Sequence, residues 1–525
     1  MGRPKQQALV IGAGPNGLVA ANRLADAGWD VLVLEAQDHV GGAVYSDQAV
    51  APGFVHDTFS SFYPLAGASS VIKGLELERH GLVWAHAPAV LGNQLPDGSW
   101  AMLYRDAERT AANLEAACPG DGDAWMALYS DWLKIGPAII EALLSPFPPV
   151  RGGLKVLAKL PSVGGLDFVR TLLEPAATMG GKRFGGEGAQ LLLAGNASHA
   201  DIPMSASGSG LLGLLLAMMG QTVGFPAPQG GAAKLSQALA DRFTSLGGEI
   251  RLNTRVARID VRNRRLKGVV TEAGEQLLAR AVVADVAATA LYGQLIDFEE
   301  LPRRTRSGMK RFEQDPATIK VDWALSSPVP WENPPDVPAG TVHVTDSVDQ
   351  LSQAQDAITN HSVPAQPFLL TGQMTSTDPT RSPVGTESLW AYTHVPQEVH
   401  RDDGPDGLTG RWDADEVERM ADRMQARIVR HAPGFESRIL ARRVLGPHQM
   451  QEMDENLIKG ALGGGTAGLH QQLIFRPVPG LGRADTPIRG VFLGSSSAHP
   501  GGGVHGACGS NAARAVIAAA RTGRL

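Results

Sequence analysis

Three separated stretches of the chain combine short apolar runs with helical periodicity, as an α/β fold with a parallel sheet requires. The first begins with apolar residues 8–11, continues through an Ala/Leu-rich segment at 18–27 that stops at Gly28, and ends with the unbroken apolar run 31–34. Glycine is common just beyond the C-terminus of a helix. A continuous apolar strand is typical of a parallel sheet that is covered on both faces. Residues 8–35 therefore predict a β-α-β unit.

The second and third stretches lie hundreds of residues further along the chain. A helix is predicted at 232–246, before a glycine pair. Four short strands are expected after it, at 249–252, 256–261, 266–271 and 279–284. Near the C-terminus, a strand at 490–494 precedes a glycine-rich turn and an alanine-rich helix from about 506 to 521. We therefore expect one Rossmann-like nucleotide-binding domain, assembled from residues 1–60, 226–295 and 486–525.

Two insertions interrupt this domain, and their patterns differ. Residues 61–225 are mainly helical in pattern, and we expect them to cover a substrate as a lid. Residues 296–485 predict an α+β substrate domain with a mixed sheet, a proline-rich loop at 328–338 and one amphipathic helix. In that helix the apolar residues recur at the helical period: Val417, Met420, Ala421, Met424 and Ile428.

Length, charge and cysteine content exclude several classes of protein. The 525 residues exceed what a single small core can hold, and a net charge of −6 does not suit a nucleic-acid partner. The two cysteines, Cys118 and Cys508, give neither a disulfide framework nor metal-ligand spacing. We therefore expect no metal and a reducing, cytoplasmic setting. The oligomeric state stays unknown.

Targeting and membrane segments are not expected. The first residues are short and polar, unlike a signal peptide. The longest apolar run, 211–219, is much shorter than the roughly 20 residues of a membrane-spanning helix. A buried helix is the favoured interpretation of this run, and peripheral contact with a membrane surface is the alternative.

A glycine motif lies between the first predicted strand and helix. Gly12 makes a tight turn, Gly14 lets the backbone approach a pyrophosphate, and Gly17 lets the helix pack closely on the strand. The helix N-terminus attracts phosphate groups. Glu35 ends the next strand at the spacing of a ribose-binding acid, and its charge disfavours NADP. The glycine pattern alone recurs at 208–213, 463–468 and 501–506.

A second glycine pair, just after Glu35, favours FAD over NAD. Gly41 and Gly42 lengthen the stretch of bare backbone that can contact the cofactor. A nicotinamide enzyme does not need this longer stretch. Taken alone, the pair fits a plain turn equally well. In this half of the site we expect cofactor contacts from Gly12, Ala13, Gly14, Pro15, Asn16, Gly17, Glu35, Ala36, Gly41, Gly42 and Ala43.

Motifs along the whole chain resemble the flavin-containing amine oxidase and phytoene desaturase superfamily. Residues 41–43 with 52–57 are similar to its flavin-contacting stretch, 247–256 to its second nucleotide segment, and 490–506 to the strand-turn-helix that closes over the isoalloxazine ring. The resemblance implies an FAD-binding domain of the glutathione-reductase type. It also implies further cofactor contacts from Val256, Gly494, Gly502, Gly503 and Val504.

Other stretches narrow the resemblance to the phytoene-dehydrogenase-related branch. They are residues 378–383, 389–396 and 472–479. Amine oxidases often place Trp and Tyr beside the flavin near the C-terminus, whereas this chain has no Trp after Trp412 and no Tyr after Tyr392. Cys508 does not match the covalent-flavin position of that branch, so we expect FAD to be bound non-covalently.

The resemblance implies hydride transfer from a substrate C–H bond to flavin N5, with an apolar, isoprenoid or acyl substrate. The helix from Gly506 would stabilise the charge that develops at N1 and O2. Two other hypotheses stay open: an amine or amino acid oxidase, and a flavin-binding protein without turnover.

Several polar residues are candidates for catalysis or for binding the substrate. His505, His499 and His199, with Asp201 beside the last, are candidates for catalysis, although such residues are more often structural. Arg476 and Arg381 suit a carboxylate, and salt bridges within loops are the alternative.

Overall fold

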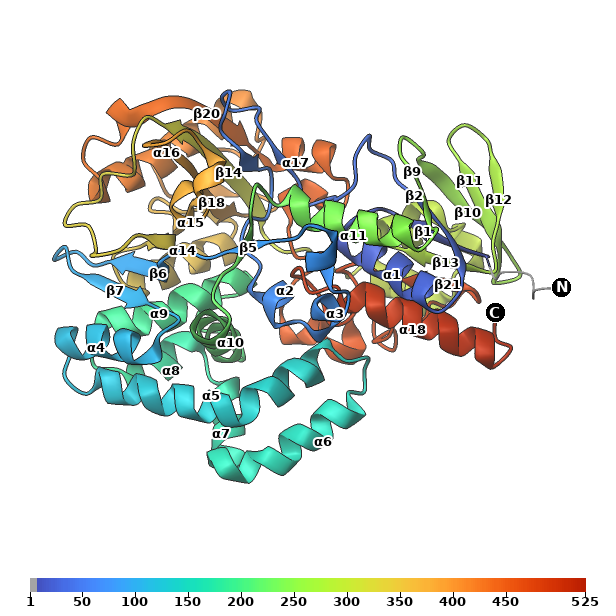
Figure 1. Cartoon of the computed structure of the whole chain (residues 1–525), viewed down its shortest axis with the longest axis horizontal. Helices are drawn as coiled ribbons and strands as arrows, with labels where there is room; N and C mark the ends of the chain where they lie inside the picture. Colours follow the sequence, from blue (N-terminus) through green and yellow to red (C-terminus); the bar gives the residue numbers. More distant parts are fainter. Residues whose placement is uncertain (1–6) are drawn as a thin grey trace.

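The computed structural model describes residues 7–525 and contains two large sheets surrounded by helices (Figure 1). The first sheet has five parallel strands in the order β21-β13-β1-β2-β9. Their bounds are β1 Gln7–Ile11, β2 Asp30–Leu34, β9 Glu249–Arg251, β13 Ala281–Ala284 and β21 Val491–Leu493. The strands come from all three predicted pieces of the nucleotide-binding domain, so the predicted fold class is confirmed.

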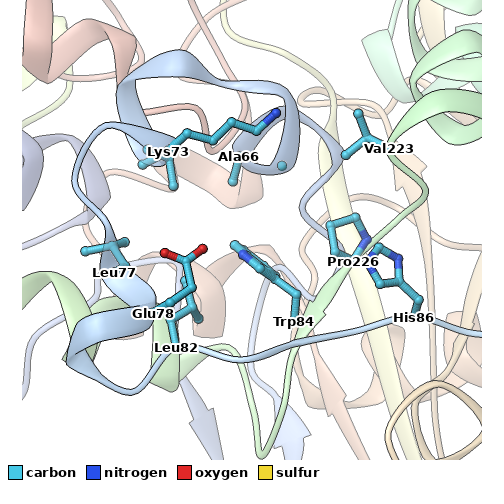
Figure 2. Close-up of a pocket in the computed structure, with 11 residues that line it drawn as sticks. Ala66, Lys73, Leu77, Glu78, Leu82, Trp84, His86, Val223 and Pro226 are labelled. Carbon is cyan, nitrogen blue, oxygen red and sulfur yellow. The ribbon is translucent and has the colours of Figure 1, made fainter.

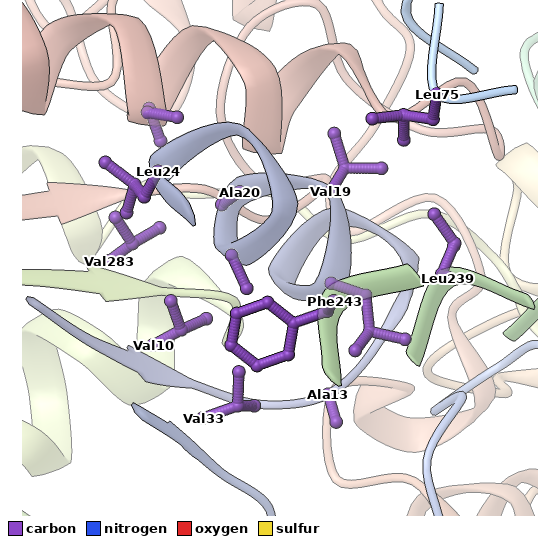
Figure 3. Packing of buried hydrophobic residues seen from close by; sticks show 14 of the residues in the cluster. Val10, Ala13, Val19, Ala20, Leu24, Val33, Leu75, Leu239, Phe243 and Val283 are labelled. Atoms are coloured by element: carbon purple, nitrogen blue, oxygen red, sulfur yellow. The ribbon is translucent and has the colours of Figure 1, made fainter. Parts of the chain in front are cut away.

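Three helices pack on this sheet: α1 (Pro15–Asp26), α11 (Ala233–Ser245) and α18 (Ala507–Arg521). Helix α1 begins with a proline at its first position, where the missing N–H costs nothing. The ring of Phe243 in α11 lies over β1 and β2, beside Val10 and Val33 (Figure 3). Helix α18 crosses α1 so closely that a Cβ on Gly509 would overlap the carbonyl oxygen of Asn16.

Two of the predicted strands belong to a separate small sheet. Strands β10 (Val256–Arg262), β11 (Arg265–Thr271) and β12 (Gln276–Leu278) pair antiparallel in sequence order. The positions of β10 and β11 agree with the sequence pattern, whereas β12 was not predicted, and the pattern contains no information on the sheet to which a strand belongs.

The second large sheet has seven strands in the order β20-β14-β18-β17-β15-β6-β7. The bounds are β6 Ala89–Gln94, β7 Trp100–Leu103, β14 Ala317–Leu325, β15 Ala339–Val344, β17 Leu369–Gln373, β18 Glu387–Val395 and β20 Ile439–Leu445. Strands β6 and β7 belong to the first insertion, which therefore supplies one edge of the substrate sheet as well as helices. Helix α16 (Ala414–His431) covers this sheet with the five apolar residues predicted for that face, and all five are buried.

The helices of the first insertion lie beside the second sheet, at the lower left of Figure 1. They are α4 Ala107–Ala117, α5 Asp121–Leu144, α6 Val150–Lys159, α7 Leu166–Leu173, α8 Ala176–Arg183, α9 Glu187–Ala197 and α10 Ser209–Thr222. The apolar run 211–219 lies in α10, which packs on α9. No helix within residues 7–525 is both long and apolar enough to cross a membrane.

Three two-stranded sheets and seven further α-helices lie between these elements of the described chain. The sheets pair β3 Ser46–Asp47 with β4 His56–Asp57, β5 Trp84–Ala85 with β8 Ala227–Pro228, and β16 Ser362–Val363 with β19 Arg401–Asp402. The helices are α2 Pro64–Ala68, α3 Ser70–Lys73, α12 Ala288–Ala290, α13 Arg303–Met309, α14 Val348–Thr359, α15 Met374–Thr377 and α17 Pro447–Met453.

A buried ion-pair network joins the two domains at Arg381. Its guanidinium lies 3.0 Å from Asp57 of the nucleotide-binding domain and 3.1 Å from Asp378 of the substrate domain. The Asp57 carboxylate also accepts a hydrogen bond from the N–H of Ala232, and Asp378 accepts one from Gly230, both at 2.7 Å. All three charged side chains are fully buried. Arg381 therefore forms the salt bridges that were the alternative to substrate binding.

Candidate functional site

A cavity of about 1730 Å³ extends from the end of β1 and β2 to the second sheet and α10. Pockets for one small molecule usually measure roughly 300–1,000 Å³, so this cavity has room for a dinucleotide and a substrate. Its lining contains twelve of the residues predicted to contact the cofactor: Gly12, Gly14, Pro15, Asn16, Glu35, Ala36, Gly42, Ala43, Val256, Gly502, Gly503 and Val504.

The other four predicted residues lie just behind this lining. The N–H of Ala13 donates to Glu35 Oε2 at 2.6 Å, and its carbonyl accepts from the N–H of Gly41 at 2.9 Å. The N–H of Gly17 donates to the side chain of Asp285 at 2.7 Å. Gly494 donates to the carbonyl of Ala284 at the end of the sheet. These residues shape the walls of the site.

At the ADP end of the site, the residues that would lie closest to the cofactor are glycines, which have no side chain. Gly12 has φ +94°, and a Cβ there would lie 2.8 Å from the carbonyl oxygen of Asp285. Glu35 is buried at the end of β2, where its two oxygens accept N–H groups from Ala13 and Gln37. Each carboxylate oxygen has a second lone pair, so Glu35 can still accept ribose hydroxyls. This cradle fits the adenosine diphosphate half of FAD.

The opposite end of the cavity is lined by the turn before α18. A Cβ on Gly502 would lie 3.0 Å from Gly463 Cα, so only glycine leaves this turn free of side chains. The first N–H groups of a helix have no partners inside the helix, and α18 begins at this turn. The turn and the helix N-terminus fit the ring end of a flavin.

Two buried carboxyl groups lie beside the dinucleotide cradle, and no sequence motif marked them. Burial raises the pKa of Asp285 to about 7, with further contributions from Asp454 and Glu35. Burial also raises the pKa of Asp454 to about 6, and Glu35 and Glu455 add to the effect. A Cβ on Gly14 would lie 2.9 Å from Asp285 Oδ2, so this carboxyl group lies where the backbone would meet the pyrophosphate.

FAD affinity is therefore expected to fall as the pH rises. Above about pH 7 Asp285 becomes charged and repels the FAD diphosphate. Asp285 must therefore take up a proton when FAD binds. The Kd for FAD should rise by up to roughly tenfold per pH unit above this value. Fluorescence titration of the apoprotein with FAD at several pH values measures this slope. Asp285→Asn should flatten it, and an equal slope in wild type and variant would contradict the assignment.

The three histidines proposed as bases line the cavity, and each has one ring nitrogen within hydrogen-bonding distance of a partner, whereas His499 Nδ1 is buried without one. His505 Nδ1 accepts the N–H of Ala507 at 3.0 Å, and burial lowers its pKa to about 4. His499 Nε2 lies 3.0 Å from the carbonyl of Ser145. Burial lowers the pKa of His199 to about 3, so its ring is neutral beside His343. Their catalytic roles stay predictions.

The substrate sheet contributes a polar group of residues that the sequence analysis missed. On neighbouring strands β14 and β18, Thr318 pairs with His394 and Lys320 with Tyr392, and all four line the cavity. Alternating polar residues in an otherwise apolar buried strand were the available signal. Of these four residues, His394 also pairs with the carboxylate of Asp201, which lines the same cavity.

Arg476, the other arginine proposed to bind a carboxylate, is fully buried in a loop. Its guanidinium donates to the carbonyl oxygens of Gly463, Gly465, Thr466 and Ser496. It therefore holds the loop that contacts the turn before α18.

A second, smaller cavity of about 210 Å³ lies near α2 and α3 (Figure 2). Its wall is mainly apolar, with Lys73 and Glu78 on opposite sides. None of the predicted cofactor residues lines it, so we place the functional site in the larger cavity.

A Rossmann-like domain, a dinucleotide cradle and a substrate sheet across one cavity define a flavin-dependent oxidoreductase. Residues 10–74 match the model of the NAD(P)-binding Rossmann-like domain, and residues 168–381 match that of the flavin containing amine oxidoreductases. The chain is similar to the flavin amine oxidase and phytoene desaturase superfamily, and this similarity implies FAD as the cofactor.

Relatives match over nearly the full chain. Pyridine nucleotide-disulfide oxidoreductase domain-containing protein 2 of Rattus norvegicus is 27% identical, covering 98% of this chain and 94% of its own length. Phytoene desaturase of Fusarium fujikuroi is 26% identical, with coverage of 95% and 87%. Among solved structures, putrescine oxidase bound to putrescine shares the fold at a TM-score of 0.61 and 18% identity, covering 98% of this chain and 100% of the other.

Proposed function

We propose that the protein is an FAD-dependent dehydrogenase or desaturase that takes hydride from a C–H bond of an apolar, isoprenoid or acyl, substrate. The observation that carries the proposal is the apolar wall that continues the cavity beyond the turn at 501–503. This wall comprises Leu143, Leu144, Leu173, Leu211, Leu212, Leu215, Leu216, Met219, Leu469 and Leu473. Three of its members, Leu173, Leu469 and Leu473, are also exposed at the surface, which gives an apolar substrate a way in.

The residues of the chain have defined tasks in this reaction. Bound FAD supplies a hydride acceptor at N5. The first turn of α18 presents a partial positive charge to the negative charge that develops near the turn at 501–503. The leucines of α10 exclude water from the reacting bond, which strengthens this electrostatic effect. The similarity to a phytoene desaturase supports an apolar substrate.

An amine oxidase is the second candidate, and one observation favours it. Trp390 and Tyr392 stack on the cavity wall with ring centroids 5.8 Å apart, and aromatic faces attract ammonium groups. Both side chains come from one strand, however, so they do not enclose a cation from two sides. The fold shared with putrescine oxidase does not distinguish a dehydrogenase or desaturase from an amine oxidase.

Anaerobic mixing of the holoprotein with candidate substrates tests the proposal. We expect isoprenoid or fatty acyl compounds to bleach the flavin absorbance and alkylamines to leave it unchanged. Bleaching by amines, with no change by any isoprenoid or acyl compound, would overturn the proposal in favour of the amine oxidase. Flavin that no compound reduces would instead support the flavin-binding protein without turnover.

FAD is expected to be bound without a covalent link to Cys508. Burial raises the pKa of this thiol to about 12, and its sulfur lies 3.5 Å from the carbonyl oxygens of Ala498 and Gly501. A protonated, buried thiol is a poor nucleophile. Acid precipitation of the holoprotein should release all flavin into the supernatant, and flavin that stays in the pellet would contradict this.

Peripheral membrane contact is proposed for helices α6 and α7. Leu154, Leu157 and Leu166 are 62%, 64% and 81% exposed there, and Lys155 and Lys159 lie beside them. Exposed leucines beside basic residues favour an anionic lipid surface. We expect the protein to co-sediment with anionic vesicles and the triple change of these leucines to serine to reduce binding.

The matched control is Leu278→Ser, which removes a leucine that is 71% exposed on the distant strand β12. It should leave vesicle binding unchanged. Equal binding by the wild type, the triple variant and this control would exclude α6 and α7 as the contact.

A further inference from the structure

Part of the cavity wall is polar, although an apolar substrate alone would require no polar wall. Asp201, His394 and Lys320 line it. Within residues 7–525, several other lining side chains also have a buried polar atom without a hydrogen-bond partner, among them Thr341 Oγ1 and Trp390 Nε1. Buried polar atoms are nearly always paired, so unpaired atoms on a cavity wall indicate a ligand with polar groups.

Asp201 is the carboxylate of this wall that is free to accept a ligand. It follows a short turn at 198–200 with φ +57°, and it lies 2.7 Å from His394 Nε2. No other hydrogen bond or ion pair to its side chain occurs in the described part of the chain. By contrast, Asp315 accepts the N–H groups of Gly463 and Gly465, so its oxygens are already used to hold that loop.

His394 fixes the charge of this pair. Burial alone would lower its pKa, but the Asp201 carboxylate, together with smaller contributions from Ala317 and Asp315, outweighs burial, so the pKa lies above the ordinary value, which favours the protonated ring. Its Nδ1 lies 3.2 Å from Thr318 Oγ1, so both ring nitrogens have partners. The carboxylate and the imidazolium together are neutral. An ammonium group placed at Asp201 would face this imidazolium, whereas a neutral hydroxyl donor would not be repelled.

The pair lies in the same cavity as the proposed reaction centre. Gly463 is held by Asp315 and contacts the turn at Gly502, where the flavin ring is expected. Asp315 and Asp201 both line the cavity, together with Gly463 and Gly502. A group bound at Asp201 therefore shares this cavity with the expected flavin ring.

We propose that the substrate carries a hydroxyl group on its apolar skeleton and that Asp201, positioned by His394, accepts the hydrogen bond from it. A pure hydrocarbon would displace water from Asp201 and leave its lone pairs unpaired, whereas a hydroxyl group replaces that water. Asp201 is thus a specificity-determining residue. The inference rests on the proposed function, because it assumes the apolar substrate and the flavin at the turn 501–503.

Three probes with one isoprenoid skeleton test this inference on the holoprotein: farnesol, its methyl ether and farnesene. The ether retains the oxygen but lacks the O–H donor. Dissociation constants come from the change in flavin absorbance on anaerobic titration. We expect farnesol to bind at least about tenfold more tightly than the ether and farnesene, since a hydrogen bond to a charged group contributes that much.

The variant Asp201→Asn should remove this preference. Asparagine tolerates the left-handed backbone conformation of this position, and its amide oxygen can face His394, which leaves the NH₂ group toward the substrate. The preference for farnesol over its methyl ether should disappear, because the NH₂ group can donate to either oxygen but cannot accept from the hydroxyl, and farnesene affinity should stay the same. Asp167→Asn, on an exposed aspartate of α7, is the matched control and should behave as the wild type. Unchanged flavin spectra in both variants verify that the fold is intact.

The outcomes separate the inference from the proposed function. Equal binding of all three probes, unaffected by Asp201→Asn, would overturn the hydroxyl site while leaving an apolar substrate in place. A preference for farnesol over its methyl ether that survives in Asp201→Asn would also overturn it. If none of the three isoprenoids binds, or if only an alkylamine does, the proposed function fails and the inference fails with it.

Discussion

Gly14→Val is expected to give a nearly colourless protein that has lost its FAD. Gly14 precedes α1 and lines the cavity, and its φ of −67° is one that valine can adopt, so the backbone itself should tolerate the change. A Cβ at this position would lie 2.9 Å from Asp285 Oδ2, and the branched side chain would fill the space for the pyrophosphate. We expect FAD affinity to fall at least about a hundredfold, or about 2.7 kcal/mol.

The ratio of flavin to protein absorbance after purification measures this loss. The control is Gly153→Val in α6, where a Cβ would meet no atom within 4 Å. This variant should retain its flavin, so a general effect of valine in place of glycine is excluded. Full flavin content in Gly14→Val would show that the N-terminus of α1 is not the cofactor site.

Arg381→Leu should have the largest effect on stability. The change removes the positive charge between Asp57 and Asp378, which are both fully buried, and leaves two carboxylates without their partner. Breaking a buried pair in this way typically costs about 3–5 kcal/mol. Because Asp57 belongs to one domain and Asp378 to the other, flavin release and loss of helical structure should shift together in a urea titration.

Arg170→Leu is the control for this experiment. Its partner Asp167 lies 3.4 Å away, and both side chains are more than three-quarters exposed. Exposed pairs of this kind contribute about 0–1 kcal/mol, so the urea midpoint should hardly change. A midpoint for Arg381→Leu that matches this control would mean that the network does not hold the domains together.

The sequence allowed the nucleotide-binding domain to be predicted because its signals are local. The strand, glycine turn and helix within residues 8–35 can be predicted from that segment alone. The helix α16 can likewise be predicted from the apolar period of its own residues. Sheet membership is not local. The pairing of β6 with β15 joins segments hundreds of residues apart, and the sequence pattern of β6 does not identify that partner.

The same limit applies to the candidate site. The glycines and Glu35 carry a recognisable spacing, whereas Asp285 and Asp454 acquire their raised pKa values only from burial in the folded chain. Asp201 and His394 become a pair through the contact between the first insertion and the substrate sheet. Isolated acids and histidines in a sequence do not show which of them will meet.

The close crossing of α1 and α18 at Asn16 and Gly509 has a consequence for biosynthesis. These two helices are far apart in the sequence, and the first turn of α1 and the turn before α18 both line the cofactor cavity. While the protein is being translated, a growing chain that already contains the whole dinucleotide cradle still lacks the helix that covers the other end of the flavin. FAD capture should therefore follow the synthesis of α18, and a messenger truncated before codon 507 should yield a protein that cannot retain flavin.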